Sequence, residues 1–444
     1  MGDFSRFSRR TVLGGLAATA TTAALAGCGG SKSGSGSGEP DSGQLNVWGG
    51  VPAESGPDDL IAAFQKEHPG ITVTYTRYVN DDSGNLKLDN SLQGGVPIDL
   101  FFSYGAGRIS KRVNAGLTMD LTDKVKEAPE LAPFAADADP LANFVFDGKV
   151  YAVPAALSPG FVLANADLLD DAGIEISEDW DVNEYHEVAK KLSEGKKKTY
   201  GSFTAPEYAK MALGPDMYYA EGGEASNFDD PAFRTGMELA LAMQDDGSIM
   251  PKQEALAEKL ETFSQSAFLS GRFAMMLTQA YMLRYVANTK EYPHDFKVRA
   301  LKLPAPVKGQ EFWNAGALGD LLSISQKSKQ QEAAWTFLSF WLANAGTYMV
   351  KGGRLPSVVD PAEADDMIDK LLGEEKDKLY DVESFKPVLF DEAIKVPVDT
   401  IYTGATEIET IVKKATDQVL LGDMTVDQWV TDVKSQADSA IKKG

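Results

Sequence analysis

The chain alternates short strand patterns with helix patterns from residue 45 onward, and this alternation limits the fold more than any other feature. Residues 45–48 predict a strand, and residues 58–67 predict a helix that ends at His68-Pro69-Gly70. Residues 71–75 alternate as a second strand, and the apolar run 98–102 is typical of a strand buried on both faces. Strands that alternate with helices predict an α/β fold, with a mostly parallel sheet covered by helices.

Local signals extend this prediction along the chain. Residues 146–151 predict a hairpin with an Asp-Gly turn. Asp181 followed by Glu184 is a capping-box pattern for a helix through Leu192, and Asp230-Pro231 predicts another helix start. Residues 330–348 predict a long helix with an apolar stripe.

Composition narrows the class of protein. The length of 444 residues predicts two or three domains with large cores. The formal net charge of −22 argues against a nucleic-acid partner. The chain has one cysteine, Cys28, so no intramolecular disulfide can form and stability must come from core packing.

The N-terminal segment has the pattern of an export signal. Three arginines precede the apolar run 11–24, which is too short to be a permanent membrane-spanning helix. Residues 8–13 resemble a twin-arginine signal, and an ordinary secretory signal is the alternative. Leu25-Ala26-Gly27-Cys28 resembles the bacterial lipobox, in which the cysteine becomes the lipid-bearing N-terminus. We therefore predict a signal peptide over residues 1–27.

A flexible tether follows Cys28. Residues 29–38 carry no apolar side chain, and ten such residues span roughly 17 Å on average as a random coil. We predict that residues 28–43 are the lipidated cysteine and its tether, with the exported protein held at the outer face of the cell membrane. The sequence leaves open which bacterial membrane holds the anchor.

No pattern for catalysis, cofactor or metal binding stands out. The three histidines lie apart, His68 is expected to cap a helix, and the sequence has no His-Glu-x-x-His, Gly-x-Ser-x-Gly or P-loop motif. The only cysteine lies in the predicted anchor, which excludes thiol catalysis and cysteine-based zinc sites in the body. We therefore expect no enzyme and no cofactor, although a glycan hydrolase with two distant carboxylates stays open.

Five segments together resemble one protein family. In chain order they are FQKEHPGITVTY, GGVPIDLFFSYGAGRISKRVNAGLTMDLT, FDGKVYAVPAALSPGFVLANADLLDDAGI, FLSGRFAMMLTQAYMLR and GDLLSISQKSKQQEAAWTFLSFWLA. They resemble the bacterial extracellular solute-binding proteins of ABC importers, of the maltose-binding-protein type. The chain departs from the family at residues 164–167, where Tyr-Asn-Lys-Asp is common, and at residues 279–281, where Gly-x-Trp is common.

The resemblance implies a two-lobed periplasmic-binding-protein-like fold with a ligand cleft between the lobes. Its implied bounds are residues 44–155 plus 304–355 for lobe 1, and 156–303 plus 356–444 for lobe 2. Closure around a ligand would stabilise one state by differential contact. The implied partners are the transmembrane subunits of an ABC importer, and we expect a monomer that binds no nucleic acid.

Residues at predicted strand ends, in loops and at helix starts are the expected ligand contacts. Aromatic planes match the apolar face of a sugar ring, and amides, carboxylates and arginine match its hydroxyls. The candidates at strand ends and among the aromatics are Trp48, Phe102, Ser103, Tyr104, Tyr218, Tyr281 and Trp313. The other polar candidates are Glu54, Gln279, Asn314 and Arg354. Ordinary packing is the alternative for each aromatic, solvation or capping for Glu54, and an electrostatic bridge between the lobes for Arg354.

The resulting hypothesis is a lipid-anchored receptor that delivers a sugar or oligosaccharide to an ABC importer. A receptor of the same fold for a polyamine or peptide is one alternative, and it predicts several carboxylates among the aromatics. A secreted glycan hydrolase is the other, and it predicts two carboxylates in the cleft.

Overall fold

The computed structural model describes residues 43–135, 145–193, 199–358, 361–391, 394–396 and 403–443. The predicted signal peptide, Cys28 and the tether through residue 42 lie outside the described residues. No helix within those ranges combines the length and the apolar character needed to cross a bilayer.

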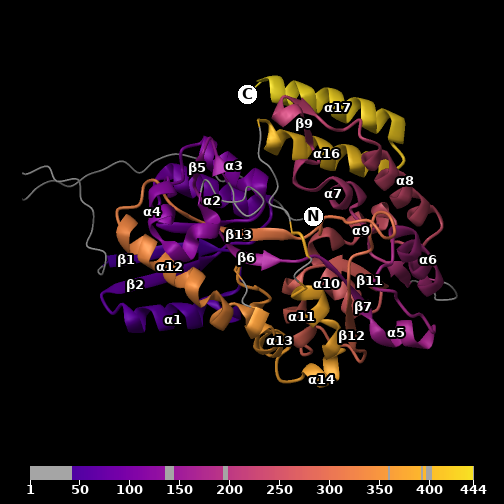
Figure 1. Ribbon diagram of the computed structural model, residues 1–444, viewed down its shortest axis with the longest axis horizontal. Helices are drawn as coiled ribbons and strands as arrows, with labels where there is room; N and C mark the ends of the chain where they lie inside the picture. The colour runs from indigo at the N-terminus through magenta and orange to yellow at the C-terminus, as the bar shows by residue number, and fades with distance from the viewer. Residues whose placement is uncertain are drawn as a thin grey trace, which may run out of the picture. The chain divides into compact units, whose positions relative to one another are not determined.

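The first sheet has five strands in the order β2-β1-β3-β13-β6 (Figure 1). Their bounds are β2 (Ile71–Arg77), β1 (Gly43–Gly49), β3 (Leu100–Ser103), β13 (Ala317–Ile324) and β6 (Val153–Ser158). β1 pairs in parallel with β2 and β3, whereas β13 is antiparallel to both β3 and β6. Four strands therefore share one direction, as a mostly parallel sheet requires, and β13 alone is reversed.

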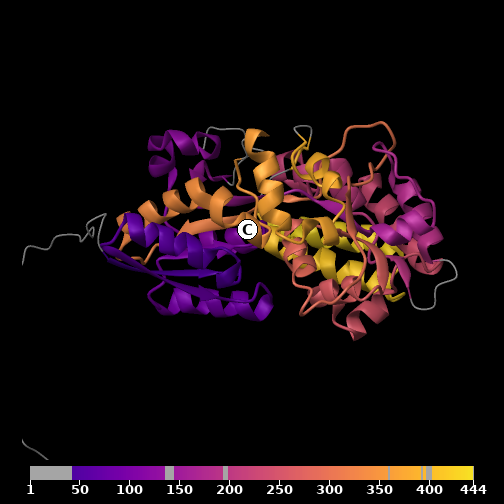
Figure 2. The same ribbon diagram turned by 90° about the horizontal axis from the view of Figure 1, so that it is seen from below.

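Helices cover both faces of the first sheet, and we call this sheet with its helices lobe 1. The helices are α1 (Pro57–Glu67), α2 (Asp82–Gly94), α3 (Ala106–Asn114), α4 (Thr122–Glu127) and α12 (Gln331–Tyr348). On one face α1 meets α12, where the rings of Phe64 and Phe337 lie 4.8 Å apart, edge to face. On the other face Leu88 of α2 packs in the same apolar cluster as Phe101. Figure 2 shows orange α12 beside the indigo elements, although they are far apart in sequence.

The second sheet has four strands in the order β12-β7-β11-β8. They are β12 (Val298–Leu301), β7 (Phe161–Asn165), β11 (Phe273–Thr278) and β8 (Tyr200–Ser202). β7 is antiparallel to both its neighbours, and only β8 and β11 are parallel. β12, β11 and β8 therefore share one direction and β7 alone is reversed, so the second sheet, like the first, has one reversed strand among strands of a common direction. The chain enters lobe 2 along β7, which leads away from the crossings, and it returns toward them along β11 and β12. Strands that lead away from the crossings and strands that lead back to them run in opposite directions, so β7 is antiparallel to β11 and β12.

Lobe 2 is the second sheet with the helices that pack on it. Phe161 and Leu163 of β7 face one apolar cluster, whereas Val162 and Ala164 face another, and none of the four is exposed. Successive side chains of a strand point to opposite faces, so this continuous apolar run marks a strand covered on both sides. The covering helices are α5 (Ala166–Asp171), α6 (Val182–Ser193), α7 (Tyr208–Leu213), α9 (Lys252–Ala257), α10 (Leu260–Leu269), α11 (Leu283–Ala287), α13 (Ala364–Leu372), α14 (Lys376–Leu379) and α15 (Lys386–Leu389).

A further apolar cluster joins the C-terminal helices to lobe 2. α16 (Ala405–Leu420) and α17 (Val426–Lys443) pack against α8 (Pro231–Asp245), with Trp429 of α17 only 2% exposed between them. The rings of Trp429 and Phe233 have centroids 5.8 Å apart. The short hairpin of β9 (Tyr219–Ala220) and β10 (Ala225–Ser226) completes this part. Figure 1 shows α16 and α17 side by side in yellow.

The chain passes from the first sheet to the second at Pro159 and Gly160, between β6 and β7. It returns between β12 and β13. After α12, Leu355 forms an isolated bridge with Leu157 of β6. The bounds of the two lobes along the whole chain stay a prediction.

Several local predictions are confirmed. The Asp181 backbone N–H donates to Glu184 Oε2, and the Glu184 N–H donates to Asp181 Oδ1, each at 2.9 Å. This reciprocal pair is the capping box of α6. β4 (Val145–Phe146) and β5 (Lys149–Val150) form the predicted hairpin, and Asp147 and Gly148 both have positive φ, as its tight turn requires. His68 caps the C-terminus of α1.

Candidate ligand-binding site

A polar cavity of about 250 Å³ lies beside the crossings, and we call it the hinge cavity. It is lined by Gly160, Thr204, Ala205, Glu207, Leu277, Thr278, Gln279, Tyr281, Leu303 and Ala315. Gln279 and Tyr281 come together here because β11 ends at Thr278 and the chain turns at once into the one-turn helix η5 (Ala280–Met282). Two of the predicted ligand contacts therefore line one cavity.

The lobe 2 wall of this cavity carries polar side chains without protein partners. Among the described residues, the side chains of Glu207 and Gln279 make no hydrogen bond or ion pair, and the buried hydroxyl of Thr278 has no partner. A buried polar atom without a partner is costly, and a ligand hydroxyl would remove that cost. The wall thus offers a carboxylate acceptor, an amide with both donor and acceptor, and a hydroxyl.

Sequence reasoning missed Glu207 and the neighbouring Thr204. Glu207 follows Pro206 at the N-terminus of α7, and it is exposed. In the sequence it is one acidic residue among 65 Asp and Glu, and nothing in its neighbours marks it. Only the fold shows that it lies next to the end of β11.

Asn314 supports the crossing between the two sheets. Its Oδ1 accepts hydrogen bonds from the backbone N–H groups of Gly160 and Gly316, each at 2.7 Å. Its Nδ2 donates to the Gly160 carbonyl at 3.0 Å. With its amide oxygen and nitrogen used and the residue 9% exposed, Asn314 fixes the two crossing segments together. Its predicted contact with a ligand stays a prediction.

The lobe 1 side of the crossings holds a buried ion pair, and we call this side the lobe 1 wall, although its side chains do not line the hinge cavity. Arg354 Nε donates to Asp320 Oδ2 at 2.7 Å, and both side chains are mostly buried. Burial lowers the pKa of Arg354, but the Asp320 carboxylate more than offsets this, so the guanidinium stays charged. Because both residues belong to lobe 1 or its crossing, the pair does not bridge the lobes. The neighbouring Gly353 lies against the backbone of Tyr281, since an added Cβ would come within 2.6 Å of the Tyr281 Cα, and this places the segment near the hinge cavity.

Two tyrosines of lobe 1 hold the loop after β1. Tyr104 Oη accepts from the Gly50 N–H at 2.6 Å, and Tyr75 Oη donates to the Val51 carbonyl at 2.9 Å. A Cβ on Gly50 would lie 3.0 Å from the Tyr104 ring, so the close approach requires glycine. Burial and the nearby Asp320 carboxylate raise the pKa of Tyr104 well above its usual value, which keeps the phenol neutral.

Ser103 and Phe102 are structural in this fold. Phe102 is 2% exposed in the core, with its ring 5.0 Å from that of Trp341. Ser103 is fully buried, and its Oγ accepts a hydrogen bond from Arg112 Nη1 at 2.7 Å. Arg112 is itself buried and donates from Nε to Asp89 Oδ1 at 2.8 Å. β3 continues through Ser103 as a buried strand, so both residues pack within lobe 1, and their ligand role stays a prediction.

The remaining predicted contacts lie away from the hinge cavity. Trp48 packs on the α2 side of the first sheet, where Lys87 Nζ lies 5.6 Å above its ring, and Glu54 is exposed. Trp313 is partly buried against Gly214, whose added Cβ would lie 2.4 Å from the indole Nε1. Tyr218 packs on Phe228 and Phe233.

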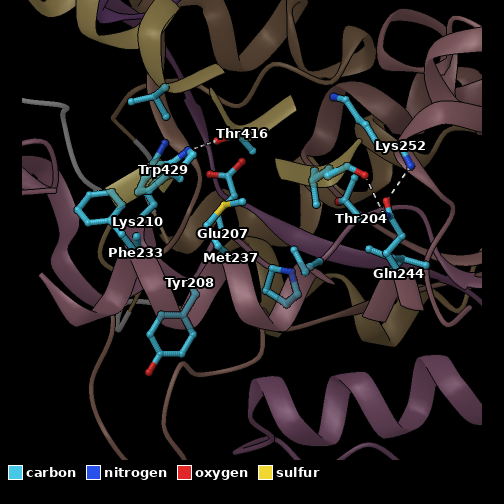
Figure 3. Close-up of a pocket in the computed structure, with 18 of the residues that line it drawn as sticks. Thr204, Glu207, Tyr208, Lys210, Phe233, Met237, Gln244, Lys252, Thr416 and Trp429 are labelled. Carbon is cyan, nitrogen blue, oxygen red and sulfur yellow. Dashed lines mark hydrogen bonds between the residues drawn. The ribbon is translucent and has the colours of Figure 1, made fainter. Parts of the chain in front are cut away.

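Two further cavities adjoin the hinge cavity through Glu207. One of about 210 Å³ lies between Ala106 of α3 and the side chains of Lys210, Tyr218 and Glu409. It is closed at one side by α16, where Thr406 Oγ1 donates to the Gly107 carbonyl at 3.0 Å. The other, of about 410 Å³, lies within lobe 2 and is mostly apolar (Figure 3). We call it the apolar cavity.

The lining of the hinge cavity offers groups that can bind a polar ligand. Within the described ranges, no three His, Cys, Asp or Glu side chains are placed to hold a metal ion. Glu207 is the one carboxylate that lines the hinge cavity. Hydroxyl-rich ligands fit such a wall, since a carboxylate, an amide and a phenol ring recognise hydroxyls and a flat apolar face.

Two α/β lobes joined by repeated crossings, with a polar cavity beside those crossings, define a bilobed ligand-binding protein. Residues 51–348 match the bacterial extracellular solute-binding protein family, and the chain belongs to that family.

Relatives with known names agree with this assignment. A galactooligosaccharide-binding protein of Bacillus subtilis (strain 168) is 25% identical over 206 residues, which are 46% of this chain and 43% of that protein. A putative ABC transporter periplasmic-binding protein of Escherichia coli (strain K12) is 27% identical over 303 residues, 63% of this chain and 64% of its own length. The chain thus matches less than two thirds of either relative.

The fold also matches solved structures. An ABC substrate-binding protein of Listeria monocytogenes, solved in complex with cycloalternan, superposes with a TM-score of 0.69 at 20% identity. The match covers 90% of this chain and 99% of that protein. At this identity the match shows the two-lobed fold.

Proposed function

We propose that this protein is a receptor that captures a sugar or oligosaccharide in the hinge cavity and delivers it to an ABC importer. The observation that carries the proposal is the set of unpartnered polar groups around that cavity: the Glu207 carboxylate, the Gln279 amide and the Thr278 hydroxyl. The Tyr281 ring supplies the flat surface that a sugar ring packs on. The names of the relatives, which include a galactooligosaccharide-binding protein, support this ligand class.

The size of the site bears on the ligand. A cavity of about 250 Å³ is smaller than the ~300–1,000 Å³ usual for drug-sized ligands, so it suits a single sugar ring. The adjoining cavity of about 210 Å³, which shares Glu207, gives room for a second unit. We therefore favour a ligand of one to a few sugar units.

A thermal-shift screen tests this function. The chain from Ser42 onward, which contains both cores, is screened with mono- and oligosaccharides, and with polyamines and short peptides as controls. A ligand at about 100 times its Kd adds roughly 2.7 kcal/mol to the folded state, a readily visible shift. A shift with a sugar that is recovered intact supports the receptor. A shift with polyamines or peptides alone contradicts the sugar assignment, and consumption of the sugar supports a hydrolase.

We also propose that Cys28 carries a lipid that holds the exported, monomeric receptor at the membrane. The proposal rests on Leu25-Ala26-Gly27-Cys28 after an apolar segment, and on the Gly/Ser tether that follows. The Cys28→Ala variant should move from the membrane fraction to the soluble fraction. Retention of that variant in the membrane would contradict the anchor.

A further inference from the structure

The apolar cavity of lobe 2 is larger than the hinge cavity and different in character. It has a volume of about 410 Å³ and lies between α7, α8, α9, α16 and α17. Its apolar lining includes Met217, Phe233, Met237, Met250, Leu420 and Trp429. Methionine and aromatic side chains make an adaptable apolar surface, which suits a planar or flexible hydrocarbon group.

Several polar groups in this lining, Glu207 excepted, already bond within the protein. Gln244 donates to the Leu420 carbonyl and accepts from the Lys252 N–H, each at 2.9 Å. The Trp429 indole Nε1 donates to Thr416 Oγ1 at 3.2 Å. Lys252 Nζ pairs with Asp417 at 2.6 Å and with Glu261. A sugar hydroxyl that entered here would find few free partners, so the cavity chiefly offers apolar contact.

The apolar cavity adjoins the hinge cavity. Thr204, Ala205 and Glu207 line both. Figure 3 shows Glu207 in the middle of the lining, between the bonded pair Thr416 and Trp429 on one side and Gln244 and Lys252 on the other. The carboxylate of Glu207 thus lies where a polar compartment meets an apolar one.

We propose that the apolar cavity binds the apolar part of an amphiphilic glycoside, such as an aryl or alkyl group linked to the sugar held in the hinge cavity. The inference rests on the proposed function, because the sugar end must occupy the hinge cavity. Glu207 then accepts a hydrogen bond from a sugar hydroxyl at the junction, and the apolar group packs among Met237, Phe233 and Trp429. A sugar without such a group uses the hinge cavity alone.

Matched glycosides test the inference by calorimetric titration. The probes are methyl and p-nitrophenyl glycosides of the same sugar, in the α- and β-glucoside and galactoside series. Burial of the aromatic ring should make the p-nitrophenyl compound bind about 10-fold or more tightly than its methyl counterpart. Ala240 of α8 lines the apolar cavity, so the larger side chain in Ala240→Leu fills part of it. In this variant the p-nitrophenyl glycoside should bind less than about 3-fold more tightly than the methyl glycoside. Binding of the methyl glycoside itself should be unchanged.

Controls separate this inference from the proposed function. Ala242→Leu, on the exposed side of α8, should bind the p-nitrophenyl glycoside more tightly than the methyl glycoside by the same factor as the parent protein does. If Ala240→Leu does not fold, Val412→Phe fills the cavity from α16. Equal binding of both glycosides, or an advantage that persists in the filled variants, overturns the inference and leaves the receptor intact. Failure of every sugar and glycoside to bind overturns both.

Discussion

The two walls at the crossings differ in how their polar groups are satisfied. In the lobe 1 wall, Arg354 pairs with Asp320 and the Tyr104 and Tyr75 hydroxyls bond to the loop after β1. In the lobe 2 wall, Glu207 and Gln279 have no side-chain partner among the described residues. A group that is bonded within the protein must lose that bond to bind a ligand, whereas a group without a protein partner exchanges only its bond to water. We therefore propose that lobe 1 presents a preassembled surface and that lobe 2 carries the recognition.

The largest expected effect is on the stability of lobe 1, where Asp89 and Arg112 form a buried ion pair. Asp89→Ala removes the carboxylate that pairs with fully buried Arg112, and an uncompensated buried charge typically costs about 3–5 kcal/mol. Urea unfolding should show this loss. Asp82→Ala, on the same helix α2, removes a partner that is 96% exposed and should change stability little. Equal losses of stability in Asp89→Ala and Asp82→Ala would contradict a stabilising role for the buried ion pair.

The same pair predicts a dependence on pH. Burial raises the pKa of Asp89, but hydrogen bonds from Lys111 and Arg112 more than offset this, and the net pKa is lowered. Since the folded pKa lies below the unfolded value of about 3.9, the pairing stabilises the fold above that value and is lost as pH falls through the folded pKa. The stability gap between the parent and Asp89→Asn should therefore narrow below about pH 4. A gap that widens there would contradict this sign.

The lobe 2 wall should show its effect in binding. Glu207→Gln removes the charge that we expect to accept a sugar hydroxyl, and a hydrogen bond to a charged group contributes about 1.5–3 kcal/mol. Affinity for a sugar found in the screen should fall roughly 10- to 100-fold, with unfolding unchanged. Glu54→Gln is the control, because Glu54 is exposed and does not line the hinge cavity. If the affinity for the sugar is unchanged in Glu207→Gln, Glu207 does not bind the sugar.

The smallest expected effect is that of Tyr104→Phe. It removes one hydrogen bond to the Gly50 N–H, which typically contributes about 0.5–1.5 kcal/mol to stability. Thermal unfolding should record a small decrease, and sugar affinity should stay within about 3-fold. A large loss of affinity would mean that the lobe 1 wall contacts the ligand directly.

The sequence predicts elements whose signals are local. Asp181 and Glu184 lie three residues apart, so their capping box is visible without the fold, and the Asp147-Gly148 turn is equally local. The direction of β7 is not local, because it depends on where the chain enters and leaves lobe 2. That is why the sequence predicts the common direction of most strands but not the reversed strands β13 and β7.

Site residues were predictable only where position along a strand decides their role. Gln279 and Tyr281 follow the end of β11 and line the hinge cavity, and their contact with a ligand stays a prediction. Asn314 bonds to Gly160, which is 154 residues away, so its structural role shows only in the fold. Ser103 accepts a hydrogen bond from the buried Arg112. Glu207 lies beside the hinge cavity because it is the N-cap residue of α7. Polar residues like these have no periodic pattern to mark them.

One titration tests the contrast between the walls most directly. Calorimetry with a sugar found in the screen compares Gln279→Ala, in the lobe 2 wall, with Tyr104→Phe, in the lobe 1 wall. The contrast predicts a loss of affinity of about tenfold or more for Gln279→Ala and little change for Tyr104→Phe. The reverse result, with affinity lost in Tyr104→Phe and kept in Gln279→Ala, would contradict the assignment of recognition to lobe 2.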